Sequence, residues 1–261
     1  MKLPIFQVDA FAEDLFKGNP AAVVPLKEWL PTETMQNIAL ENNLSETAFF
    51  VPTTAGFEIR WFTPKAEVDL CGHATLATAH TIFKEANFPK DKISFGSRSG
   101  ELTVIKKGDL LELNFPVDQI QEIEEPLELT NALGEKPQAC YMGKTDYLFV
   151  YERQEDIEQM KPDFGILSKT GARGIIITAP GKSVDFVSRF FAPGVGIDED
   201  PVTGSAHTTL TPYWAQRLGK QKLSAKQISA RGGALQCTLN ENRVLIAGHA
   251  KTYLRGEIFI K

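Results

Sequence analysis

The sequence predicts an α+β fold made of two similar halves, and two observations support this. The stretch RWFTP (60–64) returns as RFFAP (189–193), 129 residues later, and each copy precedes acidic residues, a glycine and small residues. Some segments alternate apolar and polar residues, while others repeat apolar residues every three to four positions, which are the periods of strands and helices. Chance similarity of short aromatic–proline stretches is the alternative explanation, but three matches in order favour duplication.

The first half contains two predicted helices. The segment TETMQNIALENN (32–43) has a helical pattern and precedes the predicted strand TAFFVP (47–52). A second helix is expected to begin at Gly72 or His73, directly after a glycine turn. The alternating stretch ISFGSRSGELTV (93–104) then indicates strands.

The second half follows the same order. A helix-like segment (154–167) precedes the predicted strand GIIITAP (174–180), and a further helix is predicted from about Gly204 to Gly219. Pro212 lies inside this last helix and is expected to kink it. The stretch ISARGGALQC (228–237) then resembles 93–104. Both glycine-led helices are rich in Ala and Thr, which is typical of helices packed inside a core.

These patterns predict two domains, residues 1–116 and 117–261. The acidic, proline-containing segment 116–137 interrupts the strand pattern and is the expected linker. Binding sites tend to form where two such units face each other. We therefore expect the active site in the cleft between the halves.

Composition and charge limit the kinds of molecule that the protein is expected to bind. A net charge of −5 without a basic run argues against nucleic acid or an anionic membrane, and no apolar run is long enough to cross a bilayer. The first residues lack a secretory signal pattern, so a cytoplasmic location is expected. Three scattered cysteines and four histidines without ligand spacing predict neither disulfides nor a metal site, and no phosphate-binding glycine loop is present. A small molecule is the expected partner, and no cofactor is predicted.

The two helix starts are candidate anion sites. The first N–H groups of a helix have no partner within the helix, and together with the helix dipole they favour a bound carboxylate. Gly72 and Gly204 would let a ligand approach the backbone closely. Glycine turns that only pack a helix onto a sheet are the alternative.

Four motifs then carry a resemblance to a known family. FQVDAF with GNPAAVV (6–24), LSETAFF (44–50), IRWFTPKAEVDLCGHATLATA (59–79) and DEDPVTGSAH (198–207) occur in this order and span nearly the whole chain. Together they are similar to the PhzF-type phenazine-biosynthesis isomerase family, which has the diaminopimelate epimerase fold. The resemblance implies two pseudo-symmetric halves, each a curved, barrel-like sheet around a central helix. It also implies a homodimer and a last strand, 256–261, that returns to the first half.

The resemblance also implies a set of site residues and a reaction. In the characterised phenazine enzyme, a glutamate of the SET motif moves a proton during isomerisation of a dihydro-3-hydroxyanthranilate, without metal or organic cofactor. The matching residue here is Glu46, and the positions of the other catalytic groups match His73 and Asp200. The positions that resemble the substrate-binding shell are Ser45, Cys71, Gly72, Gly204 and Ser205.

The sequence departs from relatives of this fold at one informative place. Epimerases of this fold use one cysteine from each half, whereas this chain has Cys71 in the first half and none in the matching stretch EDPVTGS. A two-cysteine racemase is therefore disfavoured, although Cys71 beside a helix start could have a lowered pKa and be reactive. A Cys–His hydrolase is disfavoured because no orienting Asn or Asp is identifiable.

Each candidate residue could instead have a purely structural role. Glu46 could be a solvated carboxylate at the rim of a sheet, or a partly desolvated one able to transfer protons. His73 at a helix start is expected to have a lowered pKa, because the positive end of the dipole disfavours a second positive charge, and it could equally be a locally satisfied capping residue. Asp200 could merely stabilise its own turn. His80, seven residues further on along the same helix face, is expected to be a packed core residue.

The leading hypothesis is a cofactor-independent isomerase of a small amino- or hydroxy-carboxylate. Glu46 would move the proton, His73 and Asp200 would position polar groups of the substrate, and the helix starts would hold its carboxylate. One alternative is a non-catalytic protein that keeps the cleft to bind a metabolite or another protein. A further alternative is an epimerase or racemase that uses Cys71 together with Glu46.

Overall fold

The chain divides into two compact units. A computed structural model describes residues 1–86 and 88–260. Unit 1 comprises Met1–Asn114 and the C-terminal segment from Ala247, and unit 2 comprises Phe115–Ile246. The C-terminal segment that belongs to unit 1 therefore begins at Ala247, earlier than residue 256. No helix among the described residues is long and apolar enough to cross a membrane.

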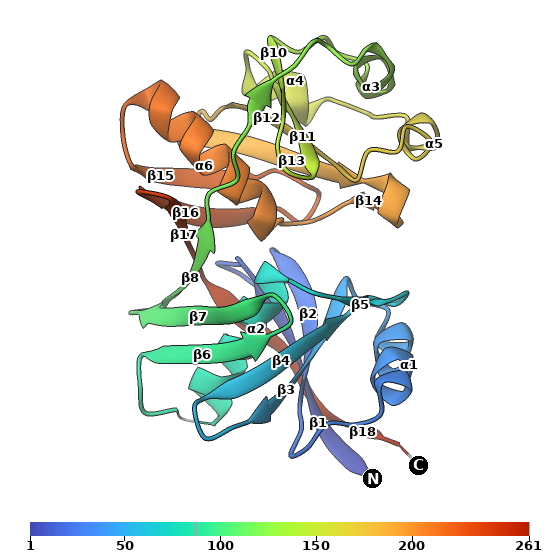
Figure 1. The fold of residues 1–261 in the computed structure, drawn as a ribbon, viewed down its shortest axis with the longest axis vertical. Coiled ribbons are helices and arrows are strands. Elements are labelled where there is room, and N and C mark those ends of the chain that lie inside the picture. Colours follow the sequence, from blue (N-terminus) through green and yellow to red (C-terminus); the bar gives the residue numbers. More distant parts are fainter. Residues whose placement is uncertain (87, 261) are drawn as a thin grey trace. The chain divides into compact units, whose positions relative to one another are not determined.

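Unit 1 is built on a curved mixed sheet (Figure 1). The pairing order is β18–β1–β2–β3–β4–β6–β7–β8, with the short β5 added to β4. Two of these pairs, β2 with β3 and β4 with β6, are parallel. The strands are β1 (Lys2–Ala10), β2 (Asn19–Pro25), β3 (Glu46–Pro52), β4 (Phe57–Phe62), β5 (Glu67–Val68), β6 (Lys92–Ser97), β7 (Gly100–Lys107), β8 (Leu110–Pro116) and β18 (Ala250–Phe259).

The helix α2 (Gly72–Glu85) is the buried helix of unit 1 and begins where the sequence predicts. It packs against β1, β2, β3 and β18, while α1 (Thr32–Asn42) packs against β3 and β4. Three buried threonines of α2, Thr75, Thr78 and Thr81, donate their hydroxyl hydrogens to carbonyls four residues back. A threonine can thus replace an apolar residue inside the sheet without leaving an unsatisfied polar group.

Unit 2 contains a second mixed sheet and four α-helices. The sheet runs β9–β10–β11–β12–β13–β15–β16, with β14 added to β13. Its strands are β9 (Gln121–Glu122), β10 (Ala139–Met142), β11 (Asp146–Val150), β12 (Gly174–Pro180), β13 (Phe186–Ala192), β14 (Ile197–Glu199), β15 (Lys222–Gln227) and β16 (Gly233–Asn240), and β17 (Arg243–Gly248) follows. The helices are α3 (Leu127–Leu133), α4 (Gln154–Glu158), α5 (Phe164–Leu167) and α6 (Gly204–Leu218), with a short 3₁₀ helix at Pro193–Val195.

The two units repeat one topology. The parallel pairs β2–β3 and β4–β6 of unit 1 correspond to β11–β12 and β13–β15 of unit 2, and a short strand precedes the buried helix in both. The helix α6 starts at Gly204 and is capped by Gly219 in the left-handed conformation, as predicted. Because the pairing pattern agrees strand by strand, duplication explains the sequence echoes better than chance.

An arginine–glutamate pair joins the same two strands in each unit. Arg60 of β4 binds both carboxylate oxygens of Glu67 at 2.7 and 2.8 Å, and Arg189 of β13 binds Glu199 at 2.7 and 2.9 Å. Both pairs are largely buried. Hydrogen bonds from Arg60 outweigh burial and hold the pKa of Glu67 below its usual value. Each pair thus anchors the short strand from which the buried helix starts a few residues later.

Two segments differ from the sequence-based expectation. The helical pattern at 154–167 forms two short helices, α4 and α5, because Pro162 between them lacks the N–H that a continuous helix needs. The expected linker at 116–137 carries α3, whose Leu129, Ala132 and Leu133 belong to the hydrophobic core of unit 2. This segment is therefore part of a unit and not a free connection.

Pro212 lies inside α6, where it removes one backbone donor. The carbonyl of Thr208, four residues earlier, would normally accept that hydrogen bond. The backbone N–H of Asp118 donates to this carbonyl instead, at 3.2 Å. The proline is thereby accommodated, since the acceptor it leaves open is used by the chain segment before β9.

Replacing the forked arginine tests its role in anchoring the short strand. We expect Arg60→Lys to lower the free energy of unfolding by about 1–2 kcal/mol, because a lysine cannot bind both carboxylate oxygens in one plane. Urea unfolding at neutral pH measures the difference. Lys107→Ala, which removes an exposed partner of Glu112, is the control and should change stability by less than about 1 kcal/mol.

The same variant makes a pH-dependent prediction. The pKa of Glu67 is lower in the folded protein, so its contribution is present above the unfolded value and is lost as the pH falls through the folded value. The stability difference between wild type and Arg60→Lys should therefore shrink in acid. A difference that stays constant from neutral pH to pH values below the folded pKa would contradict this assignment.

Candidate functional site

Glu46 is the first residue of β3, at the end of the loop that follows α1. Asn43 closes α1 in the left-handed conformation, with a φ of 49°, which asparagine tolerates better than most residues. The Asn42 side chain then donates to the hydroxyl of buried Thr47 at 3.1 Å. These two features fix the direction in which β3 begins, and the Glu46 side chain is only 13% exposed.

His73 lies beside Glu46, at the second residue of α2. Its Nε2 is 3.1 Å from Glu46 Oε2, and its Nδ1 is 3.5 Å from Cys71 Sγ and 3.3 Å from the side-chain amide of Asn19. All of these residues belong to unit 1. The imidazole therefore sits between a carboxylate on one ring nitrogen and a thiol and an amide on the other.

The contact between Glu46 and His73 is close but poorly aligned for a hydrogen bond. Among the described residues, neither Glu46 Oε2 nor His73 Nε2 has a hydrogen-bond partner of good geometry, although both atoms are buried. Buried polar atoms are normally satisfied. The pair therefore keeps hydrogen-bonding capacity that a bound molecule could use.

The pKa of His73 is raised, which corrects the lowered value expected from the helix dipole. Burial acts to lower this pKa, but the charges of Cys71 and Glu46 on the two sides of the ring raise it by more. Burial, and then the charge of Glu46, raise the pKa of the Cys71 thiol. The Cys71 thiol and the Glu46 carboxylate, one at each ring nitrogen, therefore both favour a protonated His73.

Glu46, Cys71 and His73 are also the donor types of a metal site. Their ligand atoms lie within 4.8 Å of one another. However, the carboxylate lies at Nε2 and the thiol at Nδ1. An ion bound to Nε2 would therefore lie on the far side of the ring from the thiol, and an ion bound to Nδ1 would lie on the far side from the carboxylate. This arrangement suits proton transfer along the imidazole better than chelation of one ion.

Asp200 belongs to a separate polar cluster in unit 2. It follows β14, and its carboxylate accepts a hydrogen bond from the hydroxyl of Thr203, the residue before α6. Buried Gln227 donates to the Asp200 carbonyl at 2.7 Å and accepts from the Thr203 N–H at 2.8 Å. Gln227 was missed from the sequence because it lies on β15, 27 residues beyond Asp200.

The remaining predicted site residues are placed as follows. Ser45 directly precedes Glu46 and is half-buried, and Gly72 is the first residue of α2. Gly204 and Ser205 are the first residues of α6, the glycine buried and the serine exposed. The structure thus brings Ser45, Glu46, Cys71, Gly72 and His73 together in unit 1 and Asp200, Gly204 and Ser205 together in unit 2.

Asn19 is a further residue of the candidate site that the sequence reasoning did not single out. It is the first residue of β2, is fully buried and contacts His73. The segment GNPAAVV, which contains Asn19, was part of the family resemblance, so this motif could have pointed to the residue. Its contact with a histidine 54 residues away is decided only by strand pairing.

Two other histidines, His80 and His207, are packed inside the units and hydrogen-bonded there. His80 is half-buried and its Nε2 lies 3.0 Å from the Thr252 hydroxyl, and burial lowers its pKa to about 4. His207 is fully buried, with Nδ1 at 2.8 Å from the Thr203 carbonyl, and burial also lowers its pKa to about 4.

The repeat makes the chemical asymmetry of the units visible. Cys71 and Thr203 occupy the same position before the buried helix, and His73 corresponds to Ser205. The strand start at Glu46 corresponds to Gly174, where a Cβ would collide with the Asp146 carboxylate and the Phe190 ring. At these matched positions, unit 1 therefore has a carboxylate–imidazole pair and unit 2 does not.

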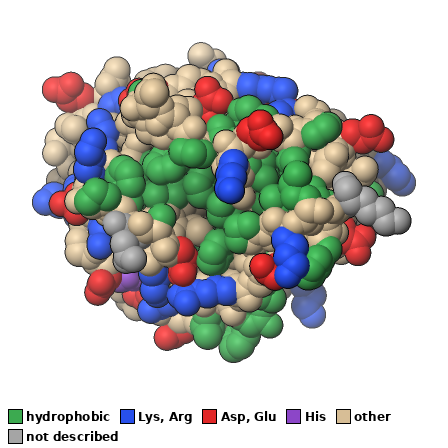
Figure 2. Space-filling model, turned by 90° about the horizontal axis from the view of Figure 1, so that it is seen from below, with side chains coloured by type: hydrophobic (Ala, Val, Ile, Leu, Met, Phe, Trp, Pro, Cys, Tyr) green, Lys and Arg blue, Asp and Glu red, His purple; other side chains and the backbone are tan. Residues whose placement is uncertain are grey.

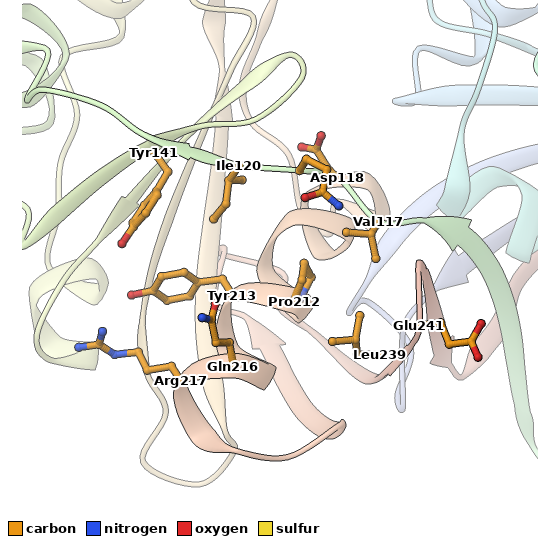
Figure 3. Close-up of a pocket in the computed structure, with 11 residues that line it drawn as sticks. Val117, Asp118, Ile120, Tyr141, Pro212, Tyr213, Gln216, Arg217, Leu239 and Glu241 are labelled. Atoms are coloured by element: carbon orange, nitrogen blue, oxygen red, sulfur yellow. The ribbon is translucent and has the colours of Figure 1, made fainter.

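Unit 2 also contains a pocket of about 620 Å³ that holds none of the predicted site residues. Figure 3 shows Tyr141 of β10 and Tyr213 of α6 on one side of it and Val117 and Asp118 on another. The Asp118 carboxylate accepts hydrogen bonds from the Thr209 hydroxyl and the Lys144 N–H. Both of its oxygens thus accept hydrogen bonds that hold this segment, in contrast to the buried Glu46 Oε2.

Solved structures with known folds match the whole chain. A crystal structure of a PhzF-family phenazine biosynthesis protein from Enterococcus faecalis aligns with a TM-score of 0.97 at 49% identity and covers 100% of both chains. A hydroxyproline epimerase from Agrobacterium vitis aligns with a TM-score of 0.64 at 9% identity, covering 98% of this chain and 92% of its own, which shows the fold alone. The fold is the α+β fold of the diaminopimelate epimerase type, as predicted.

The class of protein follows from the fold and from similar curated proteins. A Pseudomonas aeruginosa protein described as an uncharacterized isomerase is 50% identical over 260 residues, which cover 100% of both chains. The protein is an isomerase. The model of the phenazine biosynthesis-like family, PhzC-PhzF, matches residues 8–256, and the chain belongs to this family.

Removing the Glu46 charge tests the electrostatics of the site. We expect Glu46→Gln to lower the pKa of His73, because one of the charges that favour the imidazolium is lost. Histidine side-chain NMR over a pH titration measures this pKa. Glu41→Gln, the same change at an exposed position on α1, should leave it unaltered. An unchanged His73 pKa in Glu46→Gln would contradict the pairing.

Proposed function

We propose that the protein isomerises a small amino- or hydroxy-carboxylate by acid–base proton transfer, with Glu46 as the group that moves the proton. The observation that carries this proposal is the buried contact of the Glu46 carboxylate with the His73 imidazole, in which Glu46 Oε2 keeps unused hydrogen-bonding capacity. A structural ion pair would normally satisfy both partners.

The reaction needs a base that can also act as an acid. Glu46 would take a proton from a carbon of the substrate and return it to another, so that a double bond moves while the enzyme ends in its starting state. No oxidant, reductant or leaving group takes part. The raised pKa of His73 places a positive charge next to the Glu46 carboxylate, at a distance of 3.1 Å.

Binding of the substrate carboxylate is assigned to the helix starts. The first N–H groups of α2 lie at Gly72 and His73, adjacent to Glu46 in the same unit, so a carboxylate held there would bring its neighbouring carbon close to the base. Gly204 and Ser205 provide the equivalent N–H groups in unit 2. We assign Asp200 to the amino or hydroxyl group of the substrate.

A second candidate is an epimerase in which Cys71 works with Glu46. The 3.5 Å contact of Cys71 Sγ with His73 Nδ1 favours it, because the imidazole could pass a proton between thiol and carboxylate. The raised pKa of the buried thiol counts against a resting thiolate. The non-catalytic alternative is weakened by the cost of burying a carboxylate that only a reaction would need.

Proton exchange tests the role of Glu46 directly. In deuterated water, wild-type protein with a panel of dihydro-hydroxyanthranilate, amino acids and hydroxy acids should incorporate deuterium into at least one compound, as followed by NMR. Glu46→Gln should lower that rate by about 100-fold or more, the usual contribution of a general acid–base group. Glu41→Gln should retain the wild-type rate. A compound that binds equally to wild type and Glu46→Gln without exchange in either would favour the binding-protein alternative.

Replacing the thiol separates the two enzymatic candidates. If Glu46 acts alone, Cys71→Ser should keep the exchange rate within about tenfold of wild type, whereas loss of an acid–base partner would cost about 100-fold or more. Chirality of the product provides the second readout, since an epimerase inverts a centre and the proposed isomerase moves a double bond. A severe loss in Cys71→Ser together with inversion would replace the proposal by the epimerase.

A further inference from the structure

The loop between β14 and α6 is held at both ends by one side chain of β15. Gln227, the last residue of β15, donates through Nε2 to the Asp200 carbonyl at 2.7 Å and to the Thr203 hydroxyl at 3.2 Å. Its Oε1 accepts from the Thr203 N–H at 2.8 Å. A single amide thus joins the first and last residues of the loop 200–203, which leads directly into α6.

The Thr203 hydroxyl extends this contact to the Asp200 carboxylate. A hydroxyl has one hydrogen to donate and can accept through its oxygen. Because Gln227 approaches the oxygen as a donor, the hydroxyl hydrogen is directed to Asp200 Oδ2, which accepts it. Gln227 therefore holds Asp200 directly at its carbonyl and, through Thr203, at its carboxylate.

Another bond to this loop occurs in both units. The Ser229 hydroxyl donates to the Pro201 carbonyl at 2.8 Å. In unit 1, the Ser99 hydroxyl donates to the Asp69 carbonyl at 2.7 Å. The two serines lie two residues after the matched strands β15 and β6, and the two carbonyls lie three residues before the buried helices. Because both units form it, this bond belongs to the shared scaffold.

The matched positions of unit 1 hold neither the glutamine nor the carboxylate. Ser97, the last residue of β6, corresponds to Gln227, and its hydroxyl donates within its own turn, to the Gly100 carbonyl at 2.8 Å. Val68, four residues before α2, corresponds to Asp200, four residues before α6. Unit 1 forms the same strands and the same buried helix with these residues. The scaffold therefore requires neither Asp200 nor Gln227, which indicates a role besides folding for the two residues together.

Burial makes this network suited to holding a group in one orientation. The acidic and basic side chains on the face shown in Figure 2 are spread over the molecular surface, where water screens them. Gln227 and Thr203 are instead only 1% and 8% exposed, and hydrogen bonds are stronger where water is excluded. Removing one buried partner leaves the others unsatisfied, so the loop is expected to move when Gln227 is lost.

We propose that Gln227 is a positioning residue for substrate recognition and acts through Asp200. This role rests on the proposed function, which assigns Asp200 to the amino or hydroxyl group of the substrate. Gln227 fixes the orientation of the Asp200 carboxylate through Thr203. Because it also binds the Thr203 N–H, it fixes the place where α6 begins.

A carboxylate with a fixed orientation selects among substrates. It accepts a hydrogen bond only from a donor at a suitable distance and angle. The N–H groups of Gly204 and Ser205 follow Thr203 directly, so the same network sets their distance from Asp200. The ligand class that fits is a small compound that carries a carboxylate and, at a set separation from it, an amino or hydroxyl group.

Ligand binding tests the positioning role. The probe is 3-hydroxyanthranilate, a stable aromatic compound with a carboxylate, an amino group and a hydroxyl group, and calorimetry measures its Kd. Gln227→Met should raise the Kd about tenfold or more, because the buried loop loses three hydrogen bonds. Asp200→Ala should cause a comparable rise. The double variant should bind within about twofold of Asp200→Ala alone, since both changes remove the same interaction with the probe.

Further variants separate positioning from a general loss of structure. The control Ser229→Ala removes the bond that both units share and should keep the Kd within about threefold of wild type. Thr203→Ser keeps the hydroxyl and should keep the affinity, whereas Thr203→Val should lose as much as Gln227→Met. Wild type without measurable affinity for the probe, wild-type affinity in Gln227→Met, or additive losses in the double variant would overturn the proposal.

Amide hydrogen exchange, measured by NMR without any ligand, tests the hold on the loop by itself. In Gln227→Met the Thr203 N–H loses its acceptor and should exchange about tenfold faster or more. The Thr75 N–H, which donates to the Cys71 carbonyl at the start of α2, is the reference and should be unchanged. Equal exchange at Thr203 in wild type and variant would overturn the proposal. Failure of the proposed function is seen separately, as wild-type proton exchange of substrate in Glu46→Gln, and it leaves the Thr203 amide unaffected.

Discussion

The forked arginine–glutamate pair in each unit is the interaction on which the site geometry depends. Arg60 and Arg189 stand on the third strand of each repeated motif and bind both oxygens of a glutamate on the following short strand. A planar guanidinium with two parallel hydrogen bonds fixes direction as well as distance. The chain that leaves each short strand then enters a helix surrounded by sheet, where a small change of direction would misplace every group at the helix start.

Duplication of the scaffold has not duplicated the chemistry. Matched positions before the buried helices hold Cys71 and Thr203, and the matched strand starts hold Glu46 and Gly174. Unit 2 uses hydrogen bonds among Asp200, Thr203 and Gln227 where unit 1 has a carboxylate, an imidazole and a thiol. Such a difference favours a catalyst that transfers protons from one side, because a second acid–base pair is absent from the matched positions.

The environment of His73 shows how neighbouring charges can outweigh both a helix dipole and burial. The dipole at the start of α2 and the removal of water each disfavour a protonated imidazole. The Cys71 thiol at 3.5 Å from one ring nitrogen and the Glu46 carboxylate at 3.1 Å from the other reverse this balance, since Coulomb interactions strengthen where water is excluded. The resulting buried pair lies at the start of α2, which is a setting suited to an anionic substrate with a proton to lose.

The sequence by itself determined the elements and their repetition. Glycines at both helix starts, alternating apolar strands and the two aromatic–proline stretches were sufficient, because these signals are local and depend on backbone conformation and periodicity. Motifs singled out Glu46, Cys71 and His73 as candidate site residues, which the structure places side by side, and the motifs were specific enough to name the family. The splitting of the helix at 154–167 was missed because its apolar pattern outweighed a single proline.

Only the tertiary structure decided which groups share an environment. Asn19 reaches His73 through strand pairing, Gln227 reaches Asp200 from the next parallel strand, and Asp118 satisfies the carbonyl that Pro212 leaves open. Each contact joins residues that are tens of positions apart, and a pKa depends on the charges around a group rather than on its own type. The direction of the His73 pKa therefore followed from its neighbours in space and not from its place at a helix start.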